Sequence, residues 1–378
     1  MPNKKIAIIR TDPKPIDFDS YNCQELGLAY GLAKLSVDTD VYMAGDIESG
    51  NSIKTFTAHV LPGKIRIITL TYSIHPIFNQ MVYNNLESTL CKEGYDLLHV
   101  NEINEIATCH VAKIARKYQI KMLVYQGMYK NLSGKLNKIR QLLYKFYCYP
   151  KLRNSLNYTV AKTTQAERYL KHNRFLNISI FPVGLDQSKF NKTIDIDFRN
   201  QLHIPSNHKI LTYVGIFEKR RNPDFLLKIA DTLKQERYSM ILAGDGDEIE
   251  KIRRTVENKN LKNVYLTGKI SQAELPSLYK QSDLFLLASD YEIYGMVVLE
   301  SLYFGCPVFS TSTAGPENMV KSNFNGYLFD GLDESKWVSK IRKITDNFNR
   351  NEISTEMKSA YLWDILAVQY VRQYLYFK

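Results

Sequence analysis

The sequence predicts an α/β protein built from two doubly wound domains, each with a parallel sheet flanked by helices. With 378 residues, the chain exceeds the ~250–300 residues beyond which a single hydrophobic core usually divides into two. Short runs of β-branched residues alternate with stretches of helical periodicity along the chain, which is the pattern of βαβ units. Ligands of such domains bind at the carboxyl ends of the strands.

Seven strand candidates fall in the first half of the chain, with helical segments between several of them. The strands are expected at residues 5–9, 40–44, 65–70, 96–100, 121–125, 158–162 and 178–182. A helix is expected, for example, over residues 106–117. We place the first domain at residues 1–188.

Six further strand candidates follow in the second half, each succeeded by Gly, Ser or Pro and then a helical stretch. They are expected at residues 209–215, 239–244, 263–268, 283–289, 306–311 and 326–329. The polar segment 186–208 separates the two series and is the expected linker. Apolar residues near the chain end follow an i, i+3, i+4 stripe, which predicts a helix. We place the second domain at residues 189–362 and a C-terminal helix at 363–378.

The composition excludes several classes of protein. Hydrophobic residues make up 44% and charged residues 24% of the chain, which is too apolar for a disordered protein. No run approaches the ~20 apolar residues of a membrane-spanning helix, and the start lacks a signal-peptide core, so a cytoplasmic protein is expected. The five cysteines are scattered without a CxxC pair, and the Asp-x-Asp patterns fit a turn and the linker, so neither disulfides nor a metal are expected.

The formal net charge of +11 is unevenly distributed. Residues 1–190 hold 25 Lys and Arg against 15 Asp and Glu, whereas the rest of the chain holds 25 against 24. A uniformly basic nucleic-acid-binding protein would not separate its charge in this way, and no RNA-binding aromatic motif is present. Nucleic acid is therefore not an expected partner, but the first domain is expected to meet something anionic.

The most basic stretch, residues 130–154, holds seven Lys and Arg, no Asp or Glu, and a cluster of aromatic residues. Cationic side chains beside aromatics suit an anionic lipid surface, which would give the protein a peripheral place at the inner face of the cell membrane. A solvated basic helix that packs its aromatics into the core explains the same pattern. The residues expected on an acceptor-binding or membrane-facing surface are Lys130, Lys135, Lys138, Arg140 and Lys145.

Two glutamates flank the expected start of a helix in the second domain. Glu292 lies in a loop, and Glu300 follows Gly295 by five residues, just over one turn into an apolar helical stretch. The backbone amides of Gly295, Met296 and Val297 would be unpaired at that helix start and form an anion site. Carboxylates accept hydrogen bonds from vicinal hydroxyls, so the pattern predicts a ligand that carries both a phosphate and a sugar.

These residues resemble the donor-site signature of glycosyltransferase family 4, which contains retaining, nucleotide-sugar-dependent enzymes of the GT-B fold. The signature is carried by Ser289, Glu292, Tyr294, Gly295, Glu300 and the segments 305–308 and 315–317. The resemblance continues through residues 244–246, 266–286 and 326–329 and is weaker in the first half. It implies two Rossmann-like domains facing each other across a cleft, with the C-terminal helix crossing back to the first domain.

The resemblance also implies roles for individual residues. Glu300 would hold the ribose, Glu292 the donor sugar, and the amides of residues 295–297 the sugar and diphosphate. The backbone of Lys269 and Ile270 would meet the base. Arg221 would clamp the diphosphate. Since Ile216 replaces a basic residue of the family, Lys219 or Arg220 is expected to supply the missing cation.

Gln126 stands where the family commonly has histidine, and it can hydrogen-bond but cannot take a proton. Glu292, Arg221 and Gln126 are the residues predicted nearest the reaction. The resemblance implies transfer from a nucleoside diphosphate sugar, with a UDP-sugar as the leading choice, to a glycan or lipid-linked acceptor in capsule, cell-wall or exopolysaccharide synthesis. The nucleotide-sugar is a substrate, and no cofactor is expected. Alternatives are a non-catalytic transferase-like subunit, indicated by Gln126 and Ile216, and a sugar-nucleotide 2-epimerase.

Overall fold

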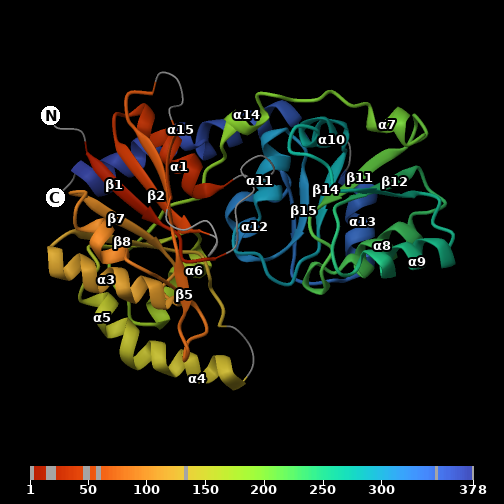
Figure 1. The fold of residues 1–378 in the computed structure, drawn as a ribbon. Helices are drawn as coiled ribbons and strands as arrows, with labels where there is room; N and C mark the ends of the chain where they lie inside the picture. Colours follow the sequence, from red (N-terminus) through yellow and green to blue (C-terminus); the bar gives the residue numbers. More distant parts are fainter. Residues whose placement is uncertain are drawn as a thin grey trace. The chain divides into compact units, whose positions relative to one another are not determined.

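A computed structural model describes residues 4–13, 23–45, 52–56, 61–131, 135–344 and 348–376. The chain forms two compact units (Figure 1). The first contains Cys23–Asp186 and Tyr361–Lys378 together with the beginning of the chain, and the second contains Gln187–Ala360. Among the described residues, no helix is long and apolar enough to cross a membrane.

The first unit is organised around a sheet with the strand order β10-β9-β8-β7-β1-β2-β4-β3. The strands are β1 (Lys5–Ile9), β2 (Asp38–Ala44), β3 (Ser52–Phe56), β4 (Ile65–Leu70), β7 (Leu97–Asn101), β8 (Lys121–Gln126), β9 (Tyr158–Ala161) and β10 (Ile178–Ile180). Neighbouring strands pair in parallel except β3 and β4. The central strands are buried on both faces, and their near-continuous apolar runs follow from that burial. The seven strands expected in this half are all present.

Helices cover both faces of this sheet, α1 and α15 on one and α3 and α5 on the other (Figure 1). The helices of the unit are α1 (Gln24–Lys34), α2 (Leu86–Leu90), α3 (Ile106–Tyr118), α4 (Lys135–Leu143), the π-helix η1 (Tyr144–Cys148), α5 (Tyr149–Arg153), α6 (Thr164–His172), α15 (Trp363–Tyr370) and the π-helix η4 (Val371–Tyr376). A hairpin of β5 (Tyr72–Ile74) and β6 (Met81–Tyr83), which the sequence did not predict, packs beside α3.

The end of the chain returns to the first unit, as expected, and packs α15 against α1. The Trp363 indole is buried over Gly27 and Gly184, and a Cβ atom at Gly184 would lie 2.5 Å from its ring. The backbone of Leu185 donates to Tyr361 O at 2.7 Å and accepts from Trp363 N at 3.2 Å. Glycine is needed at both positions because the indole occupies the space of a side chain.

The second unit contains a parallel sheet with the strand order β13-β12-β11-β14-β15-β16. Its strands are β11 (Lys209–Val214), β12 (Tyr238–Ala243), β13 (Val264–Gly268), β14 (Leu284–Leu287), β15 (Val308–Thr311) and β16 (Gly326–Phe329). Its helices are α7 (Phe198–Gln201), α8 (Pro223–Thr232), α9 (Ile249–Asn258), α10 (Leu275–Gln281), α11 (Met296–Tyr303), α12 (Ala314–Met319), α13 (Glu334–Ile344) and α14 (Arg350–Tyr361), with 3-10 turns η2 (Gln187–Phe190) and η3 (Lys219–Arg221). All six strands expected in this half are present.

The strand order of the second unit locates its binding edge. The chain runs outward from β11 through β12 to β13, then returns to place β14 on the other side of β11. The order therefore reverses between β11 and β14. In open α/β sheets, ligands bind beyond the carboxyl ends of the strands at such a reversal.

Candidate functional site

Two loops meet at the carboxyl edge of the second unit's sheet, one after β11 and one after β14. The first contains the basic run Lys219–Arg221, and the second contains Glu292. Arg220 donates to the carbonyl of Tyr291 at 2.6 Å, and Asn222 donates to that of Ala288 at 2.8 Å. Since β11 and β14 are neighbours, residues about 70 positions apart are held in one site.

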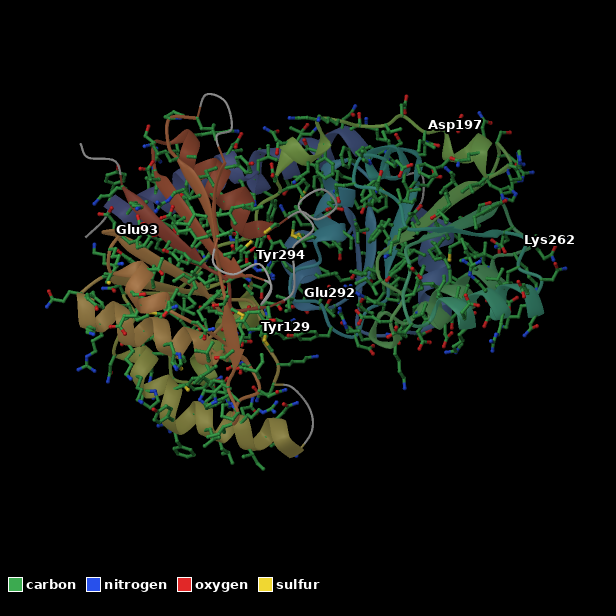
Figure 2. The ribbon with its side chains drawn as sticks, in the orientation of Figure 1. Glu93, Tyr129, Asp197, Lys262, Glu292 and Tyr294 are labelled. Atoms are coloured by element: carbon green, nitrogen blue, oxygen red, sulfur yellow. The ribbon has the colours of Figure 1, made fainter. Side chains whose placement is uncertain are left out.

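The centre of this junction is an ion pair between the Arg221 guanidinium and the Glu292 carboxylate. Figure 2 labels Glu292 in the second unit. Glu292 is 5% exposed, and Arg221 also lies 3.3 Å from Ser289 Oγ. Burial lowers the pKa of Arg221 from its ordinary value, although a guanidinium stays charged in proteins. Arg220 lies 3.8 Å from the same carboxylate and pairs with Glu218 at 2.6 Å. The structure therefore joins two residues that the sequence had predicted for separate roles.

Helix α11 begins directly after this loop. Gly295 caps it with φ of 77° and ψ of 64°, a left-handed conformation that favours glycine. Among the described backbone groups, the first amide of the helix with a backbone acceptor is that of Val298, which donates to Gly295 O at 2.9 Å. Within the described residues, the amides of Met296 and Val297 have no backbone acceptor, which is the usual state of a helix start, and they stay the predicted anion site.

Gly315 fixes the position of the same loop from the other side. It lies at the start of α12, and a Cβ atom there would collide with the backbone carbonyl of Tyr294. Tyr294 itself is buried. The glycine of the segment 315–317 is therefore required by a close backbone approach, which holds the loop beside the start of α11.

Glu300 lies inside the unit on α11, with 4% exposure. Its carboxylate accepts from Tyr279 Oη at 3.2 Å and from Gln272 Nε2 at 3.4 Å. Burial raises the pKa of Glu300 to about 7, and the two hydrogen bonds oppose that shift. Gln272 is two residues beyond Ile270, so Glu300 faces the segment predicted to meet the base.

The remaining predicted donor residues lie around the same edge of the sheet. Lys269 is exposed and Ile270 half-buried in the loop after β13, where Gly268 adopts a φ of 70°. Lys219 begins the turn η3 and is exposed. Ile216, which stands at the position where a basic residue of the family was expected, is 61% exposed. Arg220 is engaged by Tyr291 O and Glu218 but also lies 3.8 Å from the Glu292 carboxylate, so Lys219 and Arg220 both stay candidates for an additional cation.

Gln126 of the first unit has a structural environment. Its side chain is fully buried at the end of β8, where Oε1 accepts from Ile103 N and Nε2 donates to Met128 O, both at 2.8 Å. These bonds tie the loop after β7 to the loop after β8. As placed, both ends of the amide are engaged, so a direct role in the reaction would require them to be released.

The same edge of the first sheet holds charged residues that the sequence analysis did not single out. Glu102 accepts from the amides of Gly127 at 3.0 Å and Met128 at 3.1 Å and lies 3.7 Å from Lys162. Burial, together with the charge of Glu102, raises the pKa of Glu105 to about 8. Glu102 and Lys162 each directly follow a strand. A charged residue directly after a strand was the signal from which the sequence could have identified both.

The basic stretch, residues 130–154, has features of both interpretations, the membrane-facing surface and the solvated helix that packs its aromatics into the core. Tyr144 and Tyr149 are buried, whereas Phe146 and Tyr147 are exposed. The predicted surface residues Lys130, Lys138 and Lys145 are exposed and Arg140 is half-exposed, while the side chain of Lys135 lies outside the described residues. The stretch therefore packs one aromatic set into the core and presents another to solvent.

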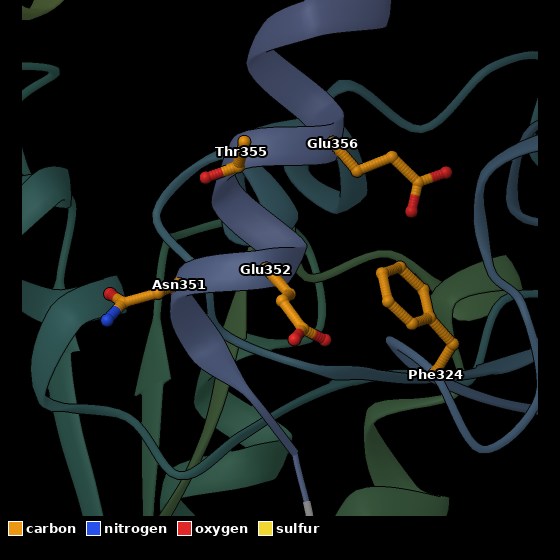
Figure 3. Close-up of a pocket in the computed structure, with 5 residues that line it drawn as sticks. All are labelled: Phe324, Asn351, Glu352, Thr355 and Glu356. Atoms are coloured by element: carbon orange, nitrogen blue, oxygen red, sulfur yellow. The ribbon is translucent and has the colours of Figure 1, made fainter.

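A hollow of about 460 Å³ beside α14 is formed by none of the predicted residues (Figure 3). Its lining consists of Phe324, Asn351, Glu352, Thr355 and Glu356. Acidic side chains at this wall would repel a diphosphate. Within the described ranges, no group of three or more His, Cys, Asp and Glu is placed to hold a metal ion. This hollow is therefore not part of the candidate site at Arg221 and Glu292.

The second unit is similar in sequence to known glycosyltransferases. The family model described as "Glycosyl transferases group 1" matches residues 195–359. D-inositol 3-phosphate glycosyltransferase of Corynebacterium jeikeium is 27% identical over 44% of this chain and 43% of its own length. Alpha-monoglucosyldiacylglycerol synthase of Streptococcus pneumoniae is 29% identical over 47% and 42%. A UDP-Gal:alpha-D-GlcNAc-diphosphoundecaprenol alpha-1,3-galactosyltransferase of Escherichia coli is 25% identical over 49% of each chain. The matches span less than half the length of these relatives.

Solved structures match nearly the whole chain. Sucrose-phosphate synthase from Thermosynechococcus elongatus superimposes with a TM-score of 0.76 at 19% identity over 98% of each chain. The Anabaena protein HepE in complex with UDP superimposes with a TM-score of 0.70 at 14% identity over 97% of this chain and 98% of its own. These likenesses establish the GT-B fold. The family match over residues 195–359 adds a similarity in sequence to group 1 glycosyltransferases.

Proposed function

We propose that this chain is a retaining glycosyltransferase that moves a sugar from a nucleoside diphosphate donor to a hydroxyl of a glycan or lipid-linked acceptor. The observation that carries the proposal is the ion pair of Arg221 with the buried Glu292, beside the start of α11, where the amides of Met296 and Val297 have no backbone acceptor among the described groups. Basic groups and backbone amides favour a diphosphate at this point, and a carboxylate favours sugar hydroxyls. A UDP-sugar is the first donor to test.

Each part of the donor has a partner in this arrangement. The guanidinium of Arg221, with Lys219 nearby, offsets the charge on the leaving diphosphate, and the amides of Met296 and Val297 donate to its oxygens. Glu292 accepts from hydroxyls of the transferred sugar. Glu300 accepts from the ribose hydroxyls in place of its present partner Gln272, with which it makes a long bond of 3.4 Å.

The chemistry requires positioning and charge stabilisation more than an enzymatic base. The bond between the sugar C1 atom and the phosphate oxygen breaks, and the acceptor oxygen bonds to C1 on the same face. The acceptor proton passes to the departing diphosphate, so that charge and atoms balance. This route is consistent with Gln126, which cannot act as a base. The acceptor is expected at the edge of the first unit where Glu102 and Lys162 lie.

The names of the relatives favour a lipid-linked acceptor. One relative is named for a diacylglycerol glycolipid and another for a diphosphoundecaprenol acceptor. An acceptor on an anionic lipid diphosphate would explain the excess of basic residues in the first half of the chain. Capsule, cell-wall or exopolysaccharide synthesis at the inner face of the membrane is the corresponding setting.

A nucleotide and nucleotide-sugar panel tests this function. At 100-fold excess over its Kd, the matching nucleoside diphosphate should add ~2.7 kcal/mol to the free energy of unfolding. Nucleotide release from the matching nucleotide-sugar should depend on acceptor and collapse in Glu292→Ala, whereas Glu250→Ala, an exposed glutamate of the same unit, should retain it. Binding without turnover on any acceptor would instead indicate a non-catalytic subunit. Acceptor-independent epimerisation of a UDP-N-acetylhexosamine would indicate an epimerase.

Nucleotide binding is expected to depend on pH through Glu300. Its pKa of about 7 in the free protein means that it is largely protonated below neutrality, whereas ribose hydroxyls donate best to the ionised carboxylate. Affinity for a nucleoside should therefore weaken as pH falls below 7, by at most about tenfold per pH unit. Calorimetric titration of the wild type and Glu300→Gln with uridine as well as UDP separates this effect from titration of the phosphate. A pH dependence that persists in Glu300→Gln with uridine would contradict it.

A further inference from the structure

The helical stretch α4–η1 has two apolar faces. Tyr144 and Cys148 are buried against the first unit. On the other face, apolar side chains at spacings of three and four residues project into solvent, which is the arrangement of a single helical stripe. These exposed residues are Ile139 (56%), Leu142 (55%), Leu143 (37%), Phe146 (76%) and Tyr147 (56%). So large an exposed apolar stripe marks an interaction surface.

The tip of the β5–β6 hairpin extends this stripe. Phe78 packs on Tyr144 with ring centroids 4.9 Å apart, and Gln80 accepts a hydrogen bond from the Tyr144 hydroxyl. Ile74 and Ile77, on the same hairpin, are 50% and 61% exposed. Two segments separated by about 60 residues in sequence are therefore in contact, and each carries exposed apolar side chains. Figure 1 shows β5 running toward α4. We name Ile74, Ile77, Ile139, Leu142, Leu143, Phe146 and Tyr147 the docking face.

The charge around the docking face selects its partner. Segments 71–85 and 130–154 contain seven Lys and Arg and no Asp or Glu. Lys138, Lys145 and Lys151 are exposed, and Lys151 lies over the Tyr147 ring at 3.3 Å from its centroid. A second copy of this chain would bring the same cations against these cations, so self-association through the face is opposed. An anionic partner is favoured.

We propose that the docking face inserts its apolar side chains into the interfacial region of an anionic lipid bilayer while the surrounding lysines contact the headgroups. Helices with this division of apolar and cationic residues lie in the plane of the interface. The inference deepens the proposed function, because it names the surface through which a lipid-linked acceptor would be reached. It assigns a role to the hairpin tip, whose sequence carries no basic residue apart from His75.

Vesicle binding tests the docking face without using the enzymatic reaction. The wild type should sediment with vesicles containing phosphatidylglycerol far more than with pure phosphatidylcholine vesicles. The double variant Leu142→Ser/Phe146→Ser should bind at least tenfold more weakly, and Ile77→Ser should also weaken binding, which separates the hairpin from the helix. Reversal of Lys138 or Lys145 to glutamate should cost roughly fivefold or more at low salt. Ile194→Ser, an exposed isoleucine of the second unit, is the matched control and should bind as the wild type does.

A fluorescence measurement reports insertion itself. Trp337 and Trp363 are both buried. The substitution Phe146→Trp would therefore add an exposed tryptophan at the docking face. Its emission should shift to the blue on addition of phosphatidylglycerol vesicles. Unchanged emission, equal binding by the serine variants, or a dimer that the serine variants convert to monomer would overturn the proposal. Loss of vesicle binding with normal turnover of a soluble acceptor would leave the transferase function intact, so the two can fail separately.

Discussion

Arg221→Met should lower kcat/KM by about 10²–10³-fold and the free energy of unfolding of the second unit by about 3–5 kcal/mol. The loss of activity follows from removing a preorganised cation from the leaving diphosphate. The loss of stability follows because Glu292, at 5% exposure, would lose its nearest cation and keep only Arg220, at 3.8 Å, to offset its charge. Few single substitutions in this unit are expected to affect both quantities so strongly.

The double variant Arg221→Met/Glu292→Gln distinguishes the two effects. With neither charge buried, most of the lost stability should return, whereas activity should remain low. Trp337 lies in the second unit and Trp363 in the first, so urea unfolding followed by fluorescence in a Trp363→Phe background reports the second unit alone. Lys228→Met, at an exposed position of α8, is the control. Strictly additive losses in the double variant would show that the ion pair is not the source of the instability.

The second unit was predictable because its signals are local. Each strand is followed within a few residues by a turn and a helix, so the order of elements can be predicted from the local sequence pattern. Gly295 is an example, since a left-handed residue before an apolar helix identifies both the turn and the free amides. The two flanking glutamates could be located on either side of that helix start from their spacing alone.

Long-range pairing could not be predicted in the same way. The contact of Arg221 with Glu292 depends on β11 and β14 being neighbours, which is a property of the sheet order rather than of either loop. Burial of the Gln126 amide depends on the backbone of Ile103 and Met128, which lie in two separate loops. The π-helical turn η1 shifts which aromatics face the core. A prediction from the regular α-helical period cannot include that shift.

Trp363→Ala should destabilise the first unit by about 3–5 kcal/mol, the usual cost of removing a large buried aromatic side chain. The indole is 2% exposed and fills the space above Gly27 and Gly184. At 2–4 °C per kcal/mol for a unit of this size, the midpoint of thermal unfolding should fall by on the order of 10 °C. Circular dichroism follows this transition, and Trp337 fluorescence serves as the control because the second unit should unfold as before. An exposed neighbour, Tyr376→Ala, should change the midpoint little.

A second substitution shows whether the indole itself imposes glycine on α1. Gly27→Ala in the wild type should destabilise, because the new methyl group collides with the Trp363 ring and overpacking typically costs about 1–3 kcal/mol. In the Trp363→Ala background, the same change should be neutral or stabilising, since the ring is gone and alanine is preferred to glycine within a helix by about 0.5–1 kcal/mol. The sign of the Gly27→Ala effect should therefore reverse between the two backgrounds. If Gly27→Ala destabilises equally in both backgrounds, the backbone of α1 rather than the Trp363 ring requires glycine at this position. The docking of α15 would then depend on other contacts.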